Sequence, residues 1–145
     1  MPNKKLTHET AAMKLCIDSV EPGHISGRVY SQRLVEPMPF EHMTGLLLQL
    51  EALMDEQRFP QAFQRIRSFT RQTPQYPEGG APEGAMSAEA VDEATGEKLT
   101  MILRVLTRQN ATWQGELDLL DGNGPVLFAS DLEFLKLVTE QVAAL

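Results

Sequence analysis

Four arginines alternate with phenylalanines in one stretch of the chain, which is its only basic and aromatic-rich segment. The arginines are Arg58, Arg65, Arg67 and Arg71, and the phenylalanines among them are Phe59, Phe63 and Phe69. Guanidinium groups beside aromatic rings suit single-stranded nucleic acid, because phosphates pair with arginine and bases stack on the rings. The alternative is a surface segment whose phenylalanines fill a small satellite core while the arginines stay in water. The sequence favours this alternative.

A second candidate binding site is the polar run Arg108, Gln109, Asn110, Ala111, Thr112, Trp113, Gln114, which leads to the single tryptophan of the chain. Its residue types suit hydrogen bonding to a ligand. Trp113, however, takes the same register as Gly115 and Leu117 on an alternating strand, which predicts that its ring points into the core.

The residues that carry most enzyme chemistry are scarce and scattered. The histidines His8, His24 and His42 lack the spacing that places two ligands on one metal ion. Cys16 has only Lys14 as a basic neighbour within two residues, so we interpret it as an inert thiol. The glycine pairs lack the helix and the lysine of a phosphate loop. We therefore predict no metal, no cofactor, no catalytic residue and no enzymatic activity.

Length and charge restrict the remaining classes. The 145 residues are enough for one domain, and 20 Asp+Glu against 13 Lys+Arg give a net charge of −7. This charge makes nucleic-acid binding less favourable. No apolar run has the length of a membrane span, the first ten residues do not resemble a signal peptide, and one cysteine suits a reducing compartment. We expect a cytoplasmic protein without a membrane partner.

The most informative pattern is an internal repeat. When the chain is shifted against itself by 88 residues, six identities coincide without a gap: Met13 on Met101, Leu15 on Leu103, Gly27 on Gly115, Pro37 on Pro125, Phe40 on Phe128 and Leu47 on Leu135. They fall at apolar, glycine and proline positions, which favours a true duplication. We predict a single pseudo-two-fold domain over 1–145, with repeat 1 at about 11–57, a connecting segment at about 58–98 and repeat 2 at about 99–145.

Each repeat contains the same predicted elements. Alternating apolar residues predict strands over about 13–18 and 25–30 in repeat 1, and over about 99–105 and 113–119 in repeat 2. A short third strand follows in each, near Phe40 and Phe128. Helical spacing then predicts a helix over Glu41–Gln57 and another after Ser130, whose capping box is completed by Glu133.

Three further expectations concern packing. Leu47 and Leu135 should be core leucines, and replacing either with alanine should lower the free energy of unfolding by roughly 2–5 kcal/mol. Gly27 and Gly115 should allow the following helix to approach the sheet. Residues 73–98, rich in proline, glycine and acidic side chains, should form a solvated linker, in which Ser87 is able to cap a short helix. The predicted fold class is α+β: duplicated β-β-β-α units forming an antiparallel sheet with two helices packed on one face.

Several blocks resemble an uncharacterised family of small bacterial proteins. They are PMPFEHMTGLLLQL at Pro37–Leu50, FPQA at Phe59–Ala62 with RSF at Arg67–Phe69, and RQNATWQG at Arg108–Gly115 with FASDLEFL at Phe128–Leu135. The resemblance implies a bacterial, cytoplasmic setting and the architecture above. It implies no activity, because the function of that family is not known to us. The chain departs from it at Ala129, where relatives tend to carry arginine.

Two functional classes remain. The first is a non-catalytic interaction or regulatory domain that binds a protein or a second copy of itself. Ile102 and Leu106 are its interface candidates, because they lie on the face of their strand that points away from the predicted helices. Either a second copy or the Phe59–Phe69 segment folding back would cover this face, and the frequency of symmetric dimers favours the second copy. The second is a single-stranded nucleic-acid binder, since duplicated strands-then-helix units resemble Pur-repeat and Whirly proteins, although those have four strands per unit. The sequence favours the first class.

Overall fold

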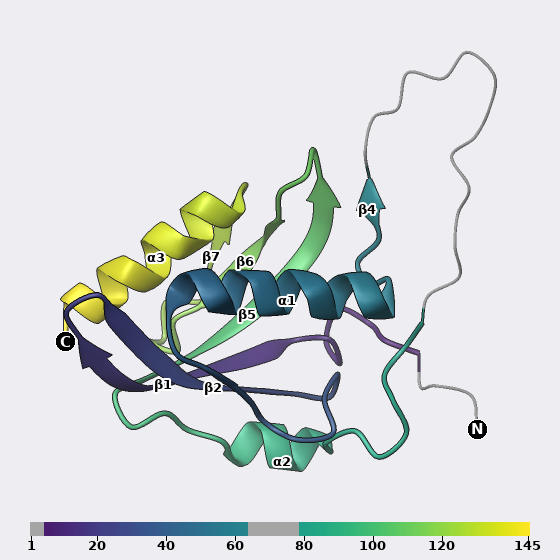
Figure 1. Ribbon diagram of the computed structural model, residues 1–145, viewed down its shortest axis with the longest axis horizontal. Coiled ribbons are helices and arrows are strands. Elements are labelled where there is room, and N and C mark those ends of the chain that lie inside the picture. The colour runs from purple at the N-terminus through teal and green to yellow at the C-terminus, as the bar shows by residue number, and fades with distance from the viewer. Residues whose placement is uncertain (1–4, 64–78) are drawn as a thin grey trace.

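The computed structural model describes residues 5–63 and 79–145. In this part of the chain, six strands form an antiparallel sheet in the order β3-β2-β1-β5-β6-β7, and there are three α-helices (Figure 1). The strands are β1 (Met13–Glu21), β2 (His24–Ser31), β3 (Met38–Phe40), β5 (Leu99–Gln109), β6 (Gln114–Asp118) and β7 (Pro125–Phe128), and a short β4 (Ala62–Phe63) pairs in parallel with the end of β5. The helices are α1 (Met43–Gln57), α2 (Ala88–Glu93) and α3 (Asp131–Ala143). The predicted α+β class with an antiparallel sheet is confirmed.

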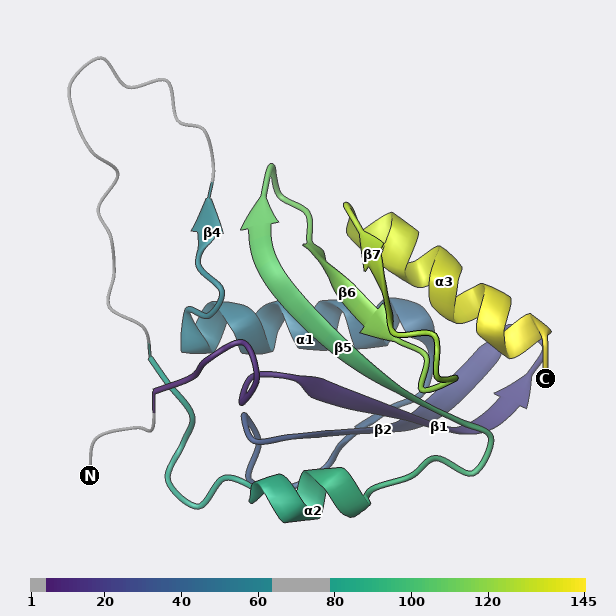
Figure 2. The ribbon, with the colours of Figure 1, turned by 180° about the vertical axis from the view of Figure 1, so that it is seen from behind.

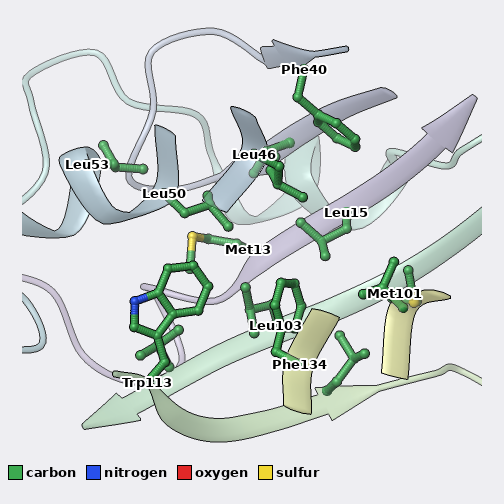
Figure 3. Close-up of a cluster of buried hydrophobic side chains, with 14 of the residues drawn as sticks. Met13, Leu15, Phe40, Leu46, Leu50, Leu53, Met101, Leu103, Trp113 and Phe134 are labelled. Carbon is green, nitrogen blue, oxygen red and sulfur yellow. The ribbon is translucent and has the colours of Figure 1, made fainter. Parts of the chain in front are cut away.

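The inner face of the sheet carries the main core. On the two central strands, every second residue points to this face and is buried in it, because side chains of a strand alternate between its faces. These residues are Met13, Leu15, Ile17, Met101, Leu103 and Val105. Helices α1 and α3 both lie over this face and add Leu46, Leu50, Phe134 and Val138 to the same cluster (Figure 3).

The two predicted core leucines are only partly buried, although Leu47 does pack against the core cluster, and the deepest helical positions are those of their neighbours. Leu46 and Phe134 are completely buried, whereas their neighbours Leu47 and Leu135 keep part of their surface in water. Successive residues of a helix point about 100° apart, so a small rotation of the helix on the sheet decides which one is covered.

Local capping signals fix where the long helices begin. The hydroxyl of Ser130 accepts the N–H of Glu133 at 3.0 Å, while the Glu133 carboxylate accepts the N–H of Ala129. The predicted Ser130 cap is confirmed, whereas Glu133 bonds the N–H of the residue before the cap in place of the Ser130 N–H that a capping box requires. Helix α1 begins after His42, whose Nδ1 accepts the N–H of Gly45, and ends at Arg58 in a left-handed conformation.

The segment 79–98 packs against the domain, which corrects its prediction as a solvated linker; residues 73–78 lie outside the described residues. The predicted helix after Ser87 is present as α2. The segment covers the outer face of β1 and β2, opposite to α1 and α3 (Figure 2). Its backbone is bonded to the rest of the fold, because the N–H of Met86 donates to the Leu34 carbonyl and that of Lys98 to the Ile17 carbonyl, both at 2.8 Å. Small residues allow this approach, since a Cβ on Gly96 would lie 2.6 Å from the Ile17 nitrogen.

The two halves of the sheet have matching strand registers. Adding 88 to each residue number converts the pair Leu15–Val29 into Leu103–Leu117, the pair Gly27–Phe40 into Gly115–Phe128, and the register shift after Ile17 into the one after Val105. The shifts increase local twist beside the mid-strand glycines.

The mid-strand glycines serve a different contact from the one predicted. A Cβ on Gly27 would lie 1.9 Å from the Cys16 carbonyl oxygen, and a Cβ on Gly115 would lie 2.0 Å from that of Arg104. Both glycines therefore make room for the backbone of the neighbouring strand, and not for a helix.

Candidate functional site

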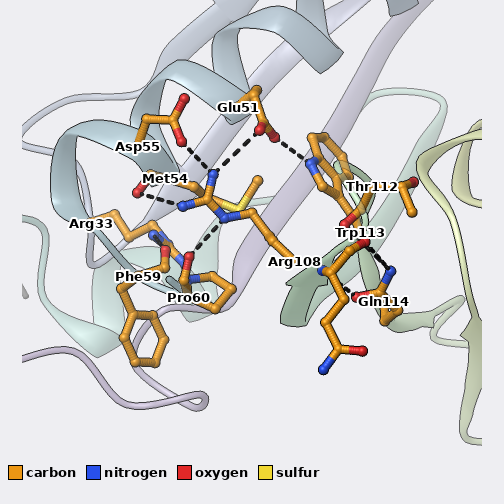
Figure 4. A network of polar contacts seen from close by, with 11 residues as sticks. Arg33, Glu51, Met54, Asp55, Phe59, Pro60, Arg108, Thr112, Trp113 and Gln114 are labelled. Carbon is orange, nitrogen blue, oxygen red and sulfur yellow. Dashed lines mark hydrogen bonds and ion pairs between the residues drawn. The ribbon is translucent and has the colours of Figure 1, made fainter. Parts of the chain in front are cut away.

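Arg108 lies in the interior, at the end of α1. Its guanidinium Nε donates to the Pro60 carbonyl at 2.7 Å, and Nη2 donates to the Met54 carbonyl at 3.3 Å (Figure 4). The third nitrogen, Nη1, contacts carboxylate oxygens of Asp55 at 2.6 Å and Glu51 at 3.3 Å. Only 3% of Arg108 is exposed, whereas the two carboxylates reach the surface. The arginine therefore closes the C-terminal end of α1, where carbonyl groups lack partners within the helix.

Trp113 belongs to the same network. Its indole Nε1 donates to the second carboxylate oxygen of Glu51, and its ring packs 5.8 Å from that of Phe134. The tryptophan is 2% exposed. Glu51 thus joins β5 and β6 to α1 through Arg108 and Trp113, and neither side chain offers a free polar atom to a ligand.

The exposed residues of this run form the tight turn between β5 and β6. Gln109 and Asn110 are exposed, and Asn110 and Ala111 have positive φ angles of 57° and 58°. The Gln114 side chain holds the turn, since it accepts the Gln109 N–H at 2.8 Å and donates to the Gln109 carbonyl at 3.1 Å. The hydrogen bonds between Gln109 and Gln114 therefore shape the turn, while the Thr112 hydroxyl bonds Asp131 at the start of α3.

A second buried guanidinium, Arg33, was not found from the sequence. Its Nε donates to the Ala11 carbonyl at 2.9 Å, and Nη1 donates to the Phe59 carbonyl at 2.8 Å and the Gln57 amide oxygen at 3.2 Å. Nη2 is buried without a hydrogen-bond partner, and the guanidinium carbon lies 5.6 Å from the centre of the Phe59 ring.

The environment of Arg33 is unfavourable for its charge. Burial lowers the pKa of Arg33 to about 10, and the nearby cation of Arg108 adds to the effect. The Phe59 ring compensates part of the missing solvation by a cation–π contact. No sequence signal marks this residue, because all of its partners are far away in the chain or are backbone atoms.

Most of the basic, aromatic-rich segment lies outside the described residues, including Arg65, Arg67, Phe69 and Arg71. Arg58 is exposed at the end of α1, and the Phe59 ring is buried in a small cluster with Leu6, Ala11 and Ala81. At Phe59, the structure agrees with the satellite-core alternative.

Other reactive groups are few within residues 5–63 and 79–145. No cluster of three or more His, Cys, Asp or Glu side chains that could hold a metal ion occurs in these ranges. Cys16 is completely buried, and burial raises the pKa of its thiol. None of the helices there has both the length and the apolar character needed to cross a bilayer.

The outer face of the sheet differs between the two halves. In the first half, Lys14 and Cys16 are buried beneath the segment 79–98, and the Lys14 ammonium donates to the Asp92 carbonyl at 2.7 Å. In the second half, Ile102 and Leu106 are partly exposed, and none of the helices in the described residues lies over β5, β6 and β7 on this side (Figure 2). Arg104 and Glu116 lie beside them and form an ion pair at 3.6 Å.

Comparisons with protein-family models, with characterised proteins and with solved structures found no match to this chain. The resemblance to an uncharacterised bacterial family stays a prediction from the sequence.

Proposed function

We propose that the chain is a duplicated, non-catalytic interaction domain that binds another protein through the outer face of its second half. This surface, which we name the open outer face, consists of Ile102, Arg104, Leu106 and Glu116. It contains both interface candidates from the sequence and combines two apolar side chains with a neutral ion pair.

The shared strand registers support the duplication. The central pairing of β1 with β5 is itself symmetric under the same 88-residue relation. Lys14 pairs with Ile102, its counterpart in the second half, and the flanking pairs Met13–Leu103 and Leu15–Met101 exchange when the halves are exchanged. A two-fold axis through the Lys14–Ile102 pair accounts for all of these pairings.

Within the described residues, the segment 79–98 covers the outer face of the sheet in the first half only, and this observation carries the functional proposal. Counterparts in a duplicated domain begin with equivalent surroundings, yet the segment 79–98 buries Cys16 and leaves its counterpart Arg104 partly exposed. Besides the Lys14 contact, the segment accepts a hydrogen bond from Arg28 at its Thr95 carbonyl. The uncovered half presents apolar side chains that in the other half would lie under protein, and exposed apolar surface of this kind marks interaction sites.

The contacts made by the polar run from Arg108 to Gln114 support a non-catalytic role. The donors of Arg108 and Trp113 are satisfied by the domain itself, and the burial of Cys16 works against a nucleophilic role. The residues with the most promising chemistry thus stabilise the fold.

A photo-reactive amino acid placed at Leu106 tests the proposal. In a lysate of the source cells, irradiation should give one defined covalent adduct with another protein, identified by mass spectrometry. The same group at Glu89, an exposed residue of α2, is the matched control and should not give that adduct. The adduct should also disappear when Arg104→Glu is added, because the new carboxylate would lie beside that of Glu116 and the surface would no longer be neutral.

Single-stranded nucleic acid is the alternative ligand, and a titration separates the two. We expect no binding of a random-sequence oligonucleotide at about 50 mM salt. Binding that falls steeply between about 50 and 200 mM salt would favour the nucleic-acid function, since phosphate contacts release counterions.

A further inference from the structure

The two edge strands of the sheet occupy equivalent positions, but only one of them is blocked at its middle residue. Strand β3 ends the sheet on one side and β7 ends it on the other. Pro39 of β3 pairs with Arg28, and Leu127 of β7 pairs with Glu116, in the same register. Edge strands offer unpaired backbone groups to other chains, and proteins block them by several devices.

Strand β3 is blocked at its middle residue. Pro39 has no N–H, and its carbonyl oxygen accepts a hydrogen bond from the Gln49 side chain at 3.0 Å. A carbonyl that bonds Gln49 points away from β2. The backbone groups of Pro39 therefore point away from β2, toward the open side of the sheet. In an antiparallel ladder, this happens at every second residue of an edge strand.

Strand β7 has the same register and lacks both devices at its middle residue, Leu127. Its first residue, Pro125, also has no N–H, and the Ala129 N–H that follows the strand already bonds Glu133, so the open part of this edge is centred on Leu127. Leu127 therefore directs an N–H and a C=O toward the edge, where no described strand pairs with them. The leucine side chain is 75% exposed, and that of Val126 is 37% exposed. The strand contains no charged residue, and the glutamate opposite Leu127 is already paired with Arg104.

We propose that β7 pairs antiparallel with β7 of a second copy, with the two-fold axis at Leu127. In this arrangement, the Leu127 N–H of each copy donates to the Leu127 C=O of the other, and the two exposed leucine side chains lie next to each other. Two copies of this edge meet without repulsion, because the strand is uncharged and Glu116 is neutralised.

The blocked edge β3 explains why such pairing ends at two copies. A chain with two open edges would add further copies and form a filament, whereas one open edge closes as a symmetric dimer. This interface adjoins the open outer face at Glu116 but lies along the edge of the sheet, so the dimer leaves Ile102, Arg104 and Leu106 available to a different protein. The sequence alone predicts self-association through Ile102 and Leu106, and the two sites are distinguished by the variants below.

Light scattering of the purified full chain after size-exclusion chromatography tests the proposal. The wild-type protein should have the mass of two chains, and Leu127→Pro should have the mass of one, because proline removes the donated N–H. The first half already carries proline at this register, so the variant should keep its fold, which circular dichroism checks. The double variant Ile102→Glu with Leu106→Glu should remain dimeric.

Crosslinking provides a second measurement that does not require proline. A short bifunctional thiol reagent should join a Leu127→Cys variant into a dimer. The control is Leu48→Cys on α1, where the native leucine is 68% exposed, and this variant should not be crosslinked. The native Cys16 does not interfere, since it is completely buried. A monomeric wild-type protein at high concentration would overturn the proposal and leave the outer-face function intact. A dimer that survives Leu127→Pro but is lost in the double variant would also overturn it and would place self-association on the open outer face.

Discussion

The Nε of Arg108 donates a hydrogen bond of 2.7 Å to the carbonyl oxygen of Pro60. This contact ties the end of β5 to the chain just after α1, two places separated by nearly fifty residues. Because Arg108 is buried, its loss would remove the donor to the Pro60 carbonyl and one of the donors to the Met54 carbonyl, which also accepts the N–H of Phe59. The conspicuous polar motif of the second half is thus a device that joins a helix to a strand.

Replacing Arg108 with methionine should lower the free energy of unfolding by about 2 kcal/mol, because the buried Pro60 carbonyl loses its donor and the Met54 carbonyl loses one of its donors. Urea unfolding measures this loss. The control is Asp55→Asn, which should cost under about 1 kcal/mol, since the Asp55 side chain is 60% exposed and surface ion pairs contribute little. Similar losses in both variants would contradict the assignment.

Truncation of the fully buried helix residues should be far more damaging than truncation of their neighbours. We expect Leu46→Ala to cost about 2–5 kcal/mol and Phe134→Ala about 3–5 kcal/mol, because each leaves a cavity between helix and sheet. Leu47→Ala and Leu135→Ala should each cost less than half as much, since water already reaches these side chains. Thermal unfolding of the four variants gives the ranking, and a larger loss at Leu47 than at Leu46 would refute it.

A methyl group on either mid-strand glycine should destabilise the sheet by at least about 2 kcal/mol, because it would overlap a backbone carbonyl that cannot move independently. Gly27→Ala and Gly115→Ala should behave alike. Gly23→Ala serves as the comparison: its Cβ meets nothing within 4 Å, so it should cost only about 1 kcal/mol, through its positive φ of 72°. Denaturant midpoints measure all three.

Acid should remove the contribution of Asp18 to the free energy of unfolding. Its carboxylate accepts a hydrogen bond of 2.7 Å from Arg28, which lowers the pKa of Asp18 in the folded state. The unfolded chain protonates near pH 4, at about 3.9. The stabilisation is therefore present above about pH 4 and is lost as the pH falls further toward the folded pKa.

The difference in unfolding free energy between wild type and Asp18→Asn should be smaller at pH 3 than at pH 7. Urea unfolding at the two pH values measures it. A difference that is the same at both would show that Asp18 acts through its hydrogen-bond geometry without its charge.

The sequence alone determined the features that depend on neighbouring residues. Alternating apolar residues identified β1, β2, β5 and β6, and Ser130 with Glu133 identified the start of α3. The α+β class also followed from these local signals. They are readable because strand alternation, helix periodicity and capping each act over a few residues.

Only the tertiary structure decided which surfaces those elements cover. Leu46 and Leu47 are adjacent and equally apolar, so the rotation of α1 on a twisted sheet had to select one of them. Arg33 became buried because the backbone carbonyls of Ala11 and Phe59 and the side-chain amide oxygen of Gln57 converge on it, and no pattern in the chain records such convergence. The segment 79–98 packs through its backbone, whose hydrogen-bonding groups are the same in every sequence. Their choice of partner depends on what the fold brings within reach.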